Sequence, residues 1–281
     1  MRKVLVVLGV LAALSFVLLR MLDAFVRNSV YPAPPVRVPP APAPLEEVAL
    51  DLATGERIVA WTHADPALPE GRPAVVFFHG NGENLETMRM AGLFDDLARL
   101  RVAWIAVDYP GYGRSTGKPA EEGVMAAADA AVAWAREHHP GRPLVLCGWS
   151  LGAAAAIGTA AHHAEPLRGL IALSPWTSLP DVARIHFPGF MVQSMLREKY
   201  DSLGAAKRIR VPALVIHGEA DNVIPAPYGK QIAAALAARW VPVPSAGHND
   251  LLARDEVWVE MERFLDGIQV KPASAPRRGR S

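Results

Sequence analysis

The stretch "LVLCGWSLGAAAAIG", residues 144–158, joins an apolar run to an alanine-rich run through one serine that is flanked by two glycines. The apolar run predicts a buried strand and the alanine-rich run predicts a helix, so Ser150 lies at a tight strand-to-helix turn. Such a turn strains the backbone at the serine and lifts its hydroxyl out of the sheet. Gly148 and Gly152 remove the side chains that would collide with the neighbouring strand and helix. We therefore predict that Ser150 is a nucleophile.

A serine hydroxyl needs a base that removes its proton and an acid that orients the base. His248, in "SAGHNDLL", follows a predicted strand and precedes the last predicted helix, which places it at the same edge of the sheet as Ser150. Asp221, in "HGEADNVIP", lies in a similar loop. The order Ser150, Asp221, His248 is the order expected for a nucleophile on such a turn. Glu219 and Asp250 are neighbouring carboxylates, and Asp250 is a stronger candidate for a structural role than for the orienting one.

Backbone N–H groups beside the predicted nucleophile can stabilise an oxyanion. The N–H of Leu151 lies at the start of the predicted helix, where the helix dipole adds positive potential. The glycines of "FFHGNGEN" allow a sharp turn beside the nucleophile, and the N–H of Asn81 is the second candidate donor. We interpret His79 as bracing this loop. Asp108, in "DYPGYGRSTG", is also interpreted as bracing, because that loop lacks the lysine and serine of a phosphate-binding loop.

Short apolar runs alternate with predicted helices across one domain at residues 46–268. "EVALDL" and "RIVAWTH" lie on either side of Thr54-Gly55-Glu56, which predicts a hairpin. The later runs are apolar throughout, as is typical of strands covered on both faces. We expect strands at 74–79, 102–107, 144–148, 170–174, 213–218 and 240–244, and helices near 85–99, 121–138, 151 onward, 228–238 and 255–267. The predicted fold class is α/β, with a mostly parallel central sheet and helices on both faces.

Composition excludes several classes of function. The chain has 281 residues, of which 51% are hydrophobic and 20% charged, so it can bury a sizeable core and is not disordered throughout. Its 29 basic and 28 acidic residues give a net charge of +1, which would not attract nucleic acid. The lone Cys147 permits no internal disulfide and is interpreted as a core residue. No group of His, Cys or carboxylates shows metal-ligand spacing, and we expect no metal and no cofactor.

Both ends of the chain differ from this domain. Residues 4–19 are uncharged and follow two basic residues, so we interpret residues 1–30 as a single-pass membrane anchor, with a cleaved signal segment as the alternative. No convincing small-x-small cleavage site follows, which favours the anchor. The basic residues flanking the apolar run leave the side of the membrane undecided. Residues 31–45 predict a proline-rich linker, and residues 269–281 predict a disordered basic tail.

A small cap over the cleft is expected at about residues 175–203, after the sixth strand. The segment is rich in large apolar side chains: Trp176, Phe187, Phe190, Met191, Met195 and Leu196. They either pack the cap onto the domain or contact an acyl chain, and both interpretations stay open. His186 is interpreted as a residue that packs in the cap or is exposed.

Five motifs, "HGNG", "DYPGYGRSTG", "GWSLG", "HGEADNVIP" and "AGHND", resemble the alpha/beta-hydrolase superfamily in their order and spacing. Within it, the chain is similar to the membrane-anchored serine hydrolases, which include acyl-protein thioesterase-like and lysophospholipase-like members. The resemblance covers residues 46–268. It implies a nucleophile, its two partners and two oxyanion donors at Ser150, Asp221, His248, Asn81 and Leu151.

The sequence thus predicts a membrane-tethered serine hydrolase that cleaves carboxylic ester or thioester bonds through an acyl-enzyme. Its expected partners are a small-molecule or lipid acyl substrate and the membrane, and no nucleic acid. A peptidase or amidase of the same fold is one alternative, because the same groups cleave both kinds of bond. A catalytically silent tethered scaffold is the other, although a binding module would not need nucleophile, base and acid together.

Overall fold

The computed structural model describes residues 16–17, 21, 25–26, 28–163 and 167–268. Most of the predicted anchor at 1–30, and all of the predicted tail at 269–281, lie outside these residues. Within the described part of the chain, no helix combines the length and the hydropathy that a membrane span requires.

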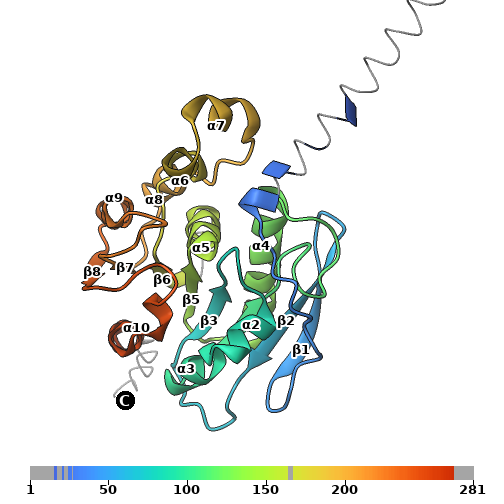
Figure 1. The fold of residues 1–281 in the computed structure, drawn as a ribbon. Helices are drawn as coiled ribbons and strands as arrows, with labels where there is room; N and C mark the ends of the chain where they lie inside the picture. Colours follow the sequence, from blue (N-terminus) through green and yellow to red (C-terminus); the bar gives the residue numbers. More distant parts are fainter. Residues whose placement is uncertain (1–15, 18–20, 22–24, 27, 164–166, 269–281) are drawn as a thin grey trace, which may run out of the picture.

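Eight strands form a single sheet (Figure 1). They are β1 (Glu46–Asp51), β2 (Arg57–His63), β3 (Ala74–Phe78), β4 (Ala103–Val107), β5 (Leu144–Trp149), β6 (Leu167–Leu173), β7 (Ala213–Gly218) and β8 (Arg239–Val243). Their order across the sheet is β1-β2-β4-β3-β5-β6-β7-β8. β1 pairs with β2 and β2 with β4 in antiparallel fashion, and the other neighbours are parallel. The predicted hairpin and the mostly parallel sheet are confirmed.

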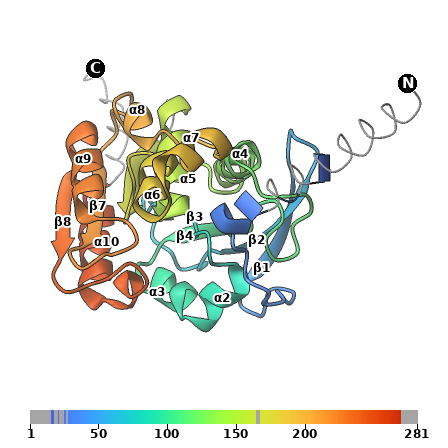
Figure 2. The same ribbon diagram turned by 45° about the horizontal axis from the view of Figure 1, so that its top comes forward.

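Helices cover both faces of this sheet (Figure 2). One face carries α4 (Glu121–His138), α5 (Leu151–His162), α8 (Ser202–Ala206) and α9 (Ala226–Leu236). The other carries α2 (Leu85–Met90), α3 (Leu93–Arg99), the 3-10 helix η1 (Leu251–Ala253) and α10 (Asp255–Gly267). The single helix expected near 85–99 is wrong: Gly92 takes a φ of 82°, in the left-handed region, and separates two shorter helices.

The central strands are apolar throughout because their side chains pack in two hydrophobic cores, one on each face of the sheet. In β3, Val76 and Phe78 pack in the core under α4 and α5, whereas Val75 and Phe77 pack in the core under α2, α3 and α10. Successive side chains of a strand point to opposite faces, so a strand buried on both faces has no polar position. The loops at the carboxyl ends of these strands are therefore anchored to strands that are packed on both faces.

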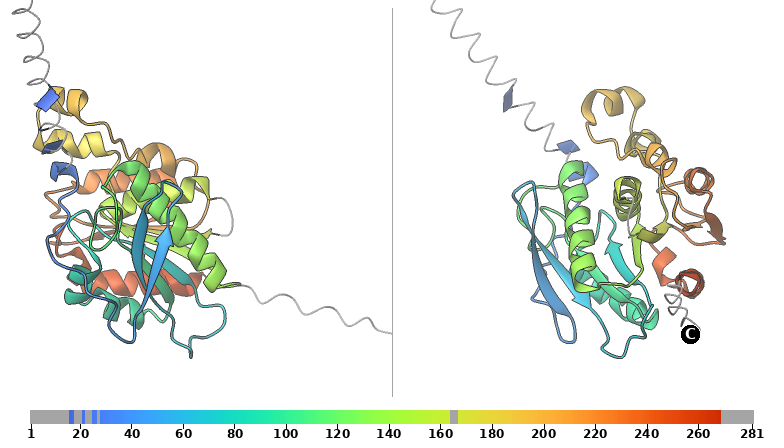
Figure 3. Two further views of the ribbon diagram at one scale, coloured as in Figure 1. Left: turned by 90° about the vertical axis from the view of Figure 1, so that its right-hand side faces the viewer. Right: turned by 180° about the vertical axis from the view of Figure 1, so that it is seen from behind.

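The helices α6 (Leu179–His186) and α7 (Gly189–Met195) follow the sixth strand and lie within the segment 175–203, for which the sequence predicts a cap. Figure 3 shows them at the same end of the molecule as the described residues among 25–30. Trp176 is buried and meets the Tyr200 ring edge-on, with the ring centroids 6.2 Å apart. Phe187 and Phe190 are instead 41% and 74% exposed, so the cap carries both packing residues and free apolar side chains.

The proline-rich residues 31–45 form neither helix nor strand, as their prolines predict, but they lie against the domain. Tyr31 is buried, and its hydroxyl lies 2.9 Å from that of Tyr200. Val38 is also buried, and Asn84 Nδ2 donates to Val36 O over 2.8 Å. At least the first half of the segment therefore contributes to the surface layer of the domain, and a further role as a linker stays a prediction.

Candidate active site

Ser150 lies at a strained turn between β5 and α5. Its φ of 56° and ψ of −116° are values that residues with a side chain rarely adopt. A Cβ atom at Gly148 would lie 2.0 Å from Gly152 O, and one at Gly152 would lie 1.9 Å from Phe78 O. Both positions therefore require glycine for α5 to approach β3 and β5 this closely, as the sequence predicts.

The structure brings the three predicted residues Ser150, His248 and Asp221 together. Ser150 Oγ lies 3.0 Å from His248 Nε2, and His248 Nδ1 lies 2.8 Å from Asp221 Oδ2. All three side chains are buried. The Trp149 ring lies beside the imidazole, with centroids 5.4 Å apart. A neutral His248 with its proton on Nδ1 would donate to Asp221 and leave Nε2 to accept the serine proton.

Asp221 is held in its ionised form by several donors. Burial raises the pKa of this carboxyl, but hydrogen bonds from His217, His248 and the N–H of Ile224 outweigh burial, so the pKa lies below its ordinary value. The N–H groups of Val223 and Ile224 donate to Oδ1 over 2.9 and 2.7 Å, which leaves Oδ2 for the histidines. The carboxylate is thus fixed in position and can stabilise a protonated His248.

His217 is a second histidine beside Asp221, and its role was not predicted from the sequence. Its ring is fully buried, and Nε2 lies 3.3 Å from Asp221 Oδ2 and 2.8 Å from Ile224 O. A Cβ atom at Gly229 would lie 2.2 Å from His217 Nδ1, so α9 closes over the ring only because that residue is glycine. The signal was the four-residue spacing in "HGEAD", which lets a strand-end histidine reach the carboxylate of the following turn.

The loop that carries Asn81 runs beside the nucleophile. A Cβ atom at Gly80 would lie 2.9 Å from the Trp149 ring, which shows how closely this loop approaches the turn at Ser150. Within the described part of the chain, the N–H groups of Asn81 and Leu151 have no hydrogen-bond partner. That these two N–H groups donate to an oxyanion stays a prediction.

Two tyrosines of "DYPGYGRSTG" hold this loop in place. Tyr109 OH donates to His79 O over 2.8 Å, and Tyr112 OH donates to Asn81 O over 3.0 Å. His79 is buried against the Tyr109 ring, with centroids 4.3 Å apart, and Asp108 accepts from the N–H of Leu85 over 2.9 Å. His79 and Asp108 thus brace the structure, and the two tyrosines are bracing residues that the sequence analysis did not identify.

Glu219 and Asp250, the other two carboxylates considered as partners of His248, have different surroundings. Glu219 is exposed. Asp250 accepts from the N–H of Gly247 over 2.7 Å and from Arg254 Nε over 3.0 Å. Asp250 therefore shapes the loop that precedes His248, which is the structural role expected of it.

The expectation that no side chains are grouped with metal-ligand spacing is wrong. Asp129 of α4 meets His162 and His163 at the carboxyl end of α5, and both Nε2 atoms lie 3.0 Å from Asp129 Oδ1. The three potential ligand atoms lie within 4.8 Å of one another, a spacing that a metal ion could use. This group could not be predicted from local spacing, because Asp129 lies more than thirty residues before the histidines. The group is at the opposite end of α5 from Ser150.

The sequence matches one family and resembles several known proteins. The family described as alpha/beta hydrolase fold matches residues 73–197. An uncharacterized protein of Mycobacterium tuberculosis is 35% identical over 208 residues, which are 73% of this chain and 72% of that protein. Protein bem46 of Schizosaccharomyces pombe is 26% identical over 234 residues, 79% of this chain and 77% of its own.

Solved structures of other proteins have a similar fold. The Pyrococcus furiosus esterase Pf2001 superposes with a TM-score of 0.67 at 17% identity, over 84% of this chain and 99% of the esterase. Est1E of Butyrivibrio proteoclasticus, solved with ferulic acid bound, gives a TM-score of 0.65 at 20% identity, over 78% of this chain and 98% of Est1E. Together with the sequence relatives, the strained serine turn and the sheet order, these likenesses establish that the chain belongs to the alpha/beta-hydrolase superfamily.

Proposed function

We propose that this chain is a serine hydrolase that cleaves carboxylic ester or thioester bonds through an acyl-enzyme. The observation that carries the proposal is the pair of contacts that joins Ser150 Oγ to His248 Nε2 over 3.0 Å and His248 Nδ1 to Asp221 over 2.8 Å. A serine on a strained turn with a base and a buried carboxylate behind it has the groups that acyl transfer requires. One protein with a similar structure is an esterase, and another was solved with ferulic acid bound, which supports an acyl substrate.

In the proposed mechanism, His248 removes the Ser150 proton as Oγ attacks the carbonyl carbon. The N–H groups of Asn81 and Leu151 donate to the oxyanion, and Asp221 stabilises the protonated imidazole. His248 then gives its proton to the leaving group, and the acyl group stays on Ser150. A water molecule, deprotonated by His248, attacks the acyl-enzyme in the same way, which releases the acid and restores the serine. These steps use only the groups of the chain and water.

The experiment that tests this mechanism is labelling of the purified protein with a fluorophosphonate probe, followed by peptide mass spectrometry. We expect the adduct on Ser150 and its loss in His248→Ala. Ser150→Ala should lower ester turnover by at least about a thousandfold without unfolding the protein. Asp250→Asn is the matched control and should keep the adduct. No adduct on a folded sample would refute the mechanism and favour a silent scaffold.

A matched ester and anilide, assayed on the same enzyme, distinguish the proposed esterase from an amidase of the same fold. The labelling test alone does not make this distinction, because an activated serine reacts with the probe in both classes. We expect the ester to be hydrolysed much faster. Comparable turnover of the anilide would contradict the ester assignment and leave the nucleophile unchanged.

We also propose that the N-terminal residues tether the domain, residues 46–268, to a membrane. The uncharged run at 4–19 and the exposed apolar side chains of Phe16, Met21 and Phe25 support this proposal. We expect the full chain in the membrane fraction of expressing cells after a high-salt wash, and a chain that lacks residues 1–24 in the soluble fraction. The full chain in the soluble fraction would contradict the tether.

A further inference from the structure

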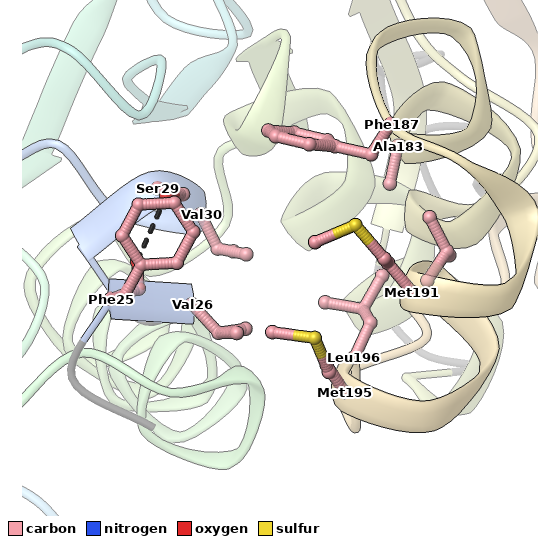
Figure 4. A pocket seen from close by; sticks show the side chains of 10 residues that line it. Phe25, Val26, Ser29, Val30, Ala183, Phe187, Met191, Met195 and Leu196 are labelled. Atoms are coloured by element: carbon pink, nitrogen blue, oxygen red, sulfur yellow. Dashed lines mark hydrogen bonds between the residues drawn. The ribbon is translucent and has the colours of Figure 1, made fainter. Parts of the chain in front are cut away.

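Two features of the described chain lie apart from the proposed active site. One is an apolar groove between the cap and the described residues among 25–30, with about 410 Å³ of empty space (Figure 4). Ser29 is the polar residue of its described lining, so the groove offers few atoms that could bind an ion. The other feature is formed by Asp129, His162 and His163, which together do offer a set of ligand atoms. We call these three residues the Asp-His-His group.

The Asp-His-His group joins two helices that pack on the same face of the sheet. Asp129 lies in α4, and the two histidines lie at the end of α5. The helices are already close one turn earlier, where a Cβ atom at Gly158 would lie 2.7 Å from the terminal methyl of Met125. The backbones of α4 and α5 therefore fix the distance across which the group forms.

The end of α5 brings the two histidines together. Consecutive residues of a regular helix do not face one another. His163, however, is the C-cap of α5, and its φ of −93° and ψ of 92° show that the helix has ended there. The ring centroids of His162 and His163 lie 4.8 Å apart, and both rings contact Asp129.

The three ligand atoms converge on a small volume. Nε2 of each histidine lies 3.0 Å from Asp129 Oδ1, and the three atoms all lie within 4.8 Å of one another. Zinc binds imidazole nitrogens and carboxylate oxygens at about 2.0–2.2 Å, so the ligand atoms of a tetrahedral ion lie about 3.3 Å apart. Both distances to Asp129 are therefore within about 0.3 Å of those in a zinc site.

The ligand atoms and their exposure select the class of ion. Imidazole nitrogens suit zinc, copper and nickel, whereas magnesium and calcium prefer oxygen ligands. The side chains of His163, Asp129 and His162 are 23%, 43% and 51% exposed, so an ion can enter from solvent and water can complete its fourth position. Without an ion, the group is a pair of partly exposed contacts between aspartate and histidine, which stabilise a protein little.

We propose that Asp129, His162 and His163 bind a divalent transition-metal ion, with Zn²⁺ as the expected one, and that the ion clamps α4 to α5. Each imidazole binds through Nε2 and carries its proton on Nδ1, and Asp129 binds as the carboxylate. The site lies at the end of α5 opposite Ser150. This inference is therefore independent of the proposed function.

The test is zinc binding to the full chain, purified in detergent without a polyhistidine tag and stripped of metal with EDTA. Titration with ZnCl₂ against a chromophoric chelator measures the affinity and the number of ions bound. Because the group has three ligands where a zinc finger has four, we expect one ion per chain and a Kd on the order of micromolar. Asp129→Ala, His162→Ala and His163→Ala each remove one ligand and should raise Kd at least about tenfold.

Thermal unfolding gives a second readout that does not depend on hydrolysis. An ion that binds the folded chain and not the unfolded chain stabilises the fold. At a zinc concentration of about a hundred times Kd, we expect the unfolding midpoint of the wild type to rise by about 5 °C. The midpoints of the three alanine variants should hardly change.

His138→Ala is the matched control. His138 and His139 repeat the two-histidine sequence at the end of α4, and His138 is exposed, with Nδ1 2.9 Å from Trp134 O. Among the residues that the structure describes, neither belongs to a group with metal-ligand spacing. The control should bind zinc as the wild type does. So should His248→Ala, which removes the base of the proposed active site.

Three results would overturn the proposal. The first is a wild-type Kd above about 100 µM, which would leave the group as hydrogen-bonded side chains only. The second is an affinity that is unchanged in the three alanine variants, or lost in His248→Ala, because the ion would then lie elsewhere. The third is competition by Ca²⁺ or Mg²⁺ as effective as that by Ni²⁺, which would contradict the class of ion. The fluorophosphonate adduct on Ser150 is measured separately, so failure of this site and failure of the proposed function are distinguishable.

Discussion

The variant Gly152→Ala tests whether the close approach of α5 to the sheet builds the active site. The added Cβ would lie 1.9 Å from Phe78 O, whereas ordinary van der Waals contact begins at 3.4 Å. The new Cβ is fixed to the backbone of α5, and Phe78 O belongs to the backbone that follows β3. Neither atom can turn aside as a side chain can, so α5 must move away from β3. Misplacement of reacting groups by about 1 Å costs on the order of a hundredfold in rate, and overpacking costs about 1–3 kcal/mol in stability. We therefore expect a folded protein with kcat/KM lowered at least about a hundredfold.

Gly158→Ala in the same helix is the matched control. Its Cβ would lie 2.7 Å from the terminal methyl of Met125, a flexible side-chain end that can turn aside. Alanine also favours a helix interior over glycine by about 1 kcal/mol, so stability should be kept. The assay is hydrolysis of p-nitrophenyl acetate, with thermal unfolding of both variants. Near-normal turnover in a folded Gly152→Ala protein would refute the reasoning, because the helix position would then not matter to the chemistry.

Three further predictions concern the residues behind His248. Asp221→Asn should lower kcat by about 10⁴-fold, because the amide holds the imidazole in the wrong tautomer, whereas Asp250→Asn should change kcat far less. His217→Ala should lower kcat about tenfold or more through the lost donor to a buried carboxylate, and His217→Gln, which keeps a donor, should recover part of it; equal losses would exclude this role. The folded-state pKa of Asp221 lies below the unfolded value of about 3.9, so its contribution to stability is present above that pH and is lost as pH falls. In urea unfolding, the free-energy difference between wild type and Asp221→Asn should therefore shrink from about pH 6 to about pH 3, and a constant difference would contradict it.

The fold could be predicted from the sequence because its signals are local. Apolar runs such as residues 144–149 mark strands that are buried on both faces. The turn residues at 54–56 mark the hairpin in which β1 and β2 pair in antiparallel fashion. The alternation of strands with helices then places the loops after β5, β7 and β8 at one edge of the sheet. That placement is why Ser150, Asp221 and His248 could be selected before their distances were known.

What could not be predicted depends on contacts between segments far apart in the chain. Val30 receives a hydrogen bond from Asn81, and Tyr31 meets Tyr200 across 169 positions. No local pattern records such pairs, so the proline-rich segment read as a spacer although its first half packs on the domain. The group of Asp129 with two histidines escaped for the same reason. The division of residues 85–99 into two helices is different: it depends on one glycine, Gly92, whose conformation a helical pattern does not reveal.

The two sides of the proposed site have unequal freedom to change. On one side, Gly152 against Phe78 O ties α5 to the sheet, and the buried Asp221 is held by two N–H groups and two histidines. A substitution there moves the core as well as the chemistry. On the other side, the cap with its helices α6 and α7 exposes apolar side chains such as Phe187 and Phe190. Substitutions of these exposed side chains leave the groups around Ser150 in place, so we expect the cap to vary while the mechanism is retained.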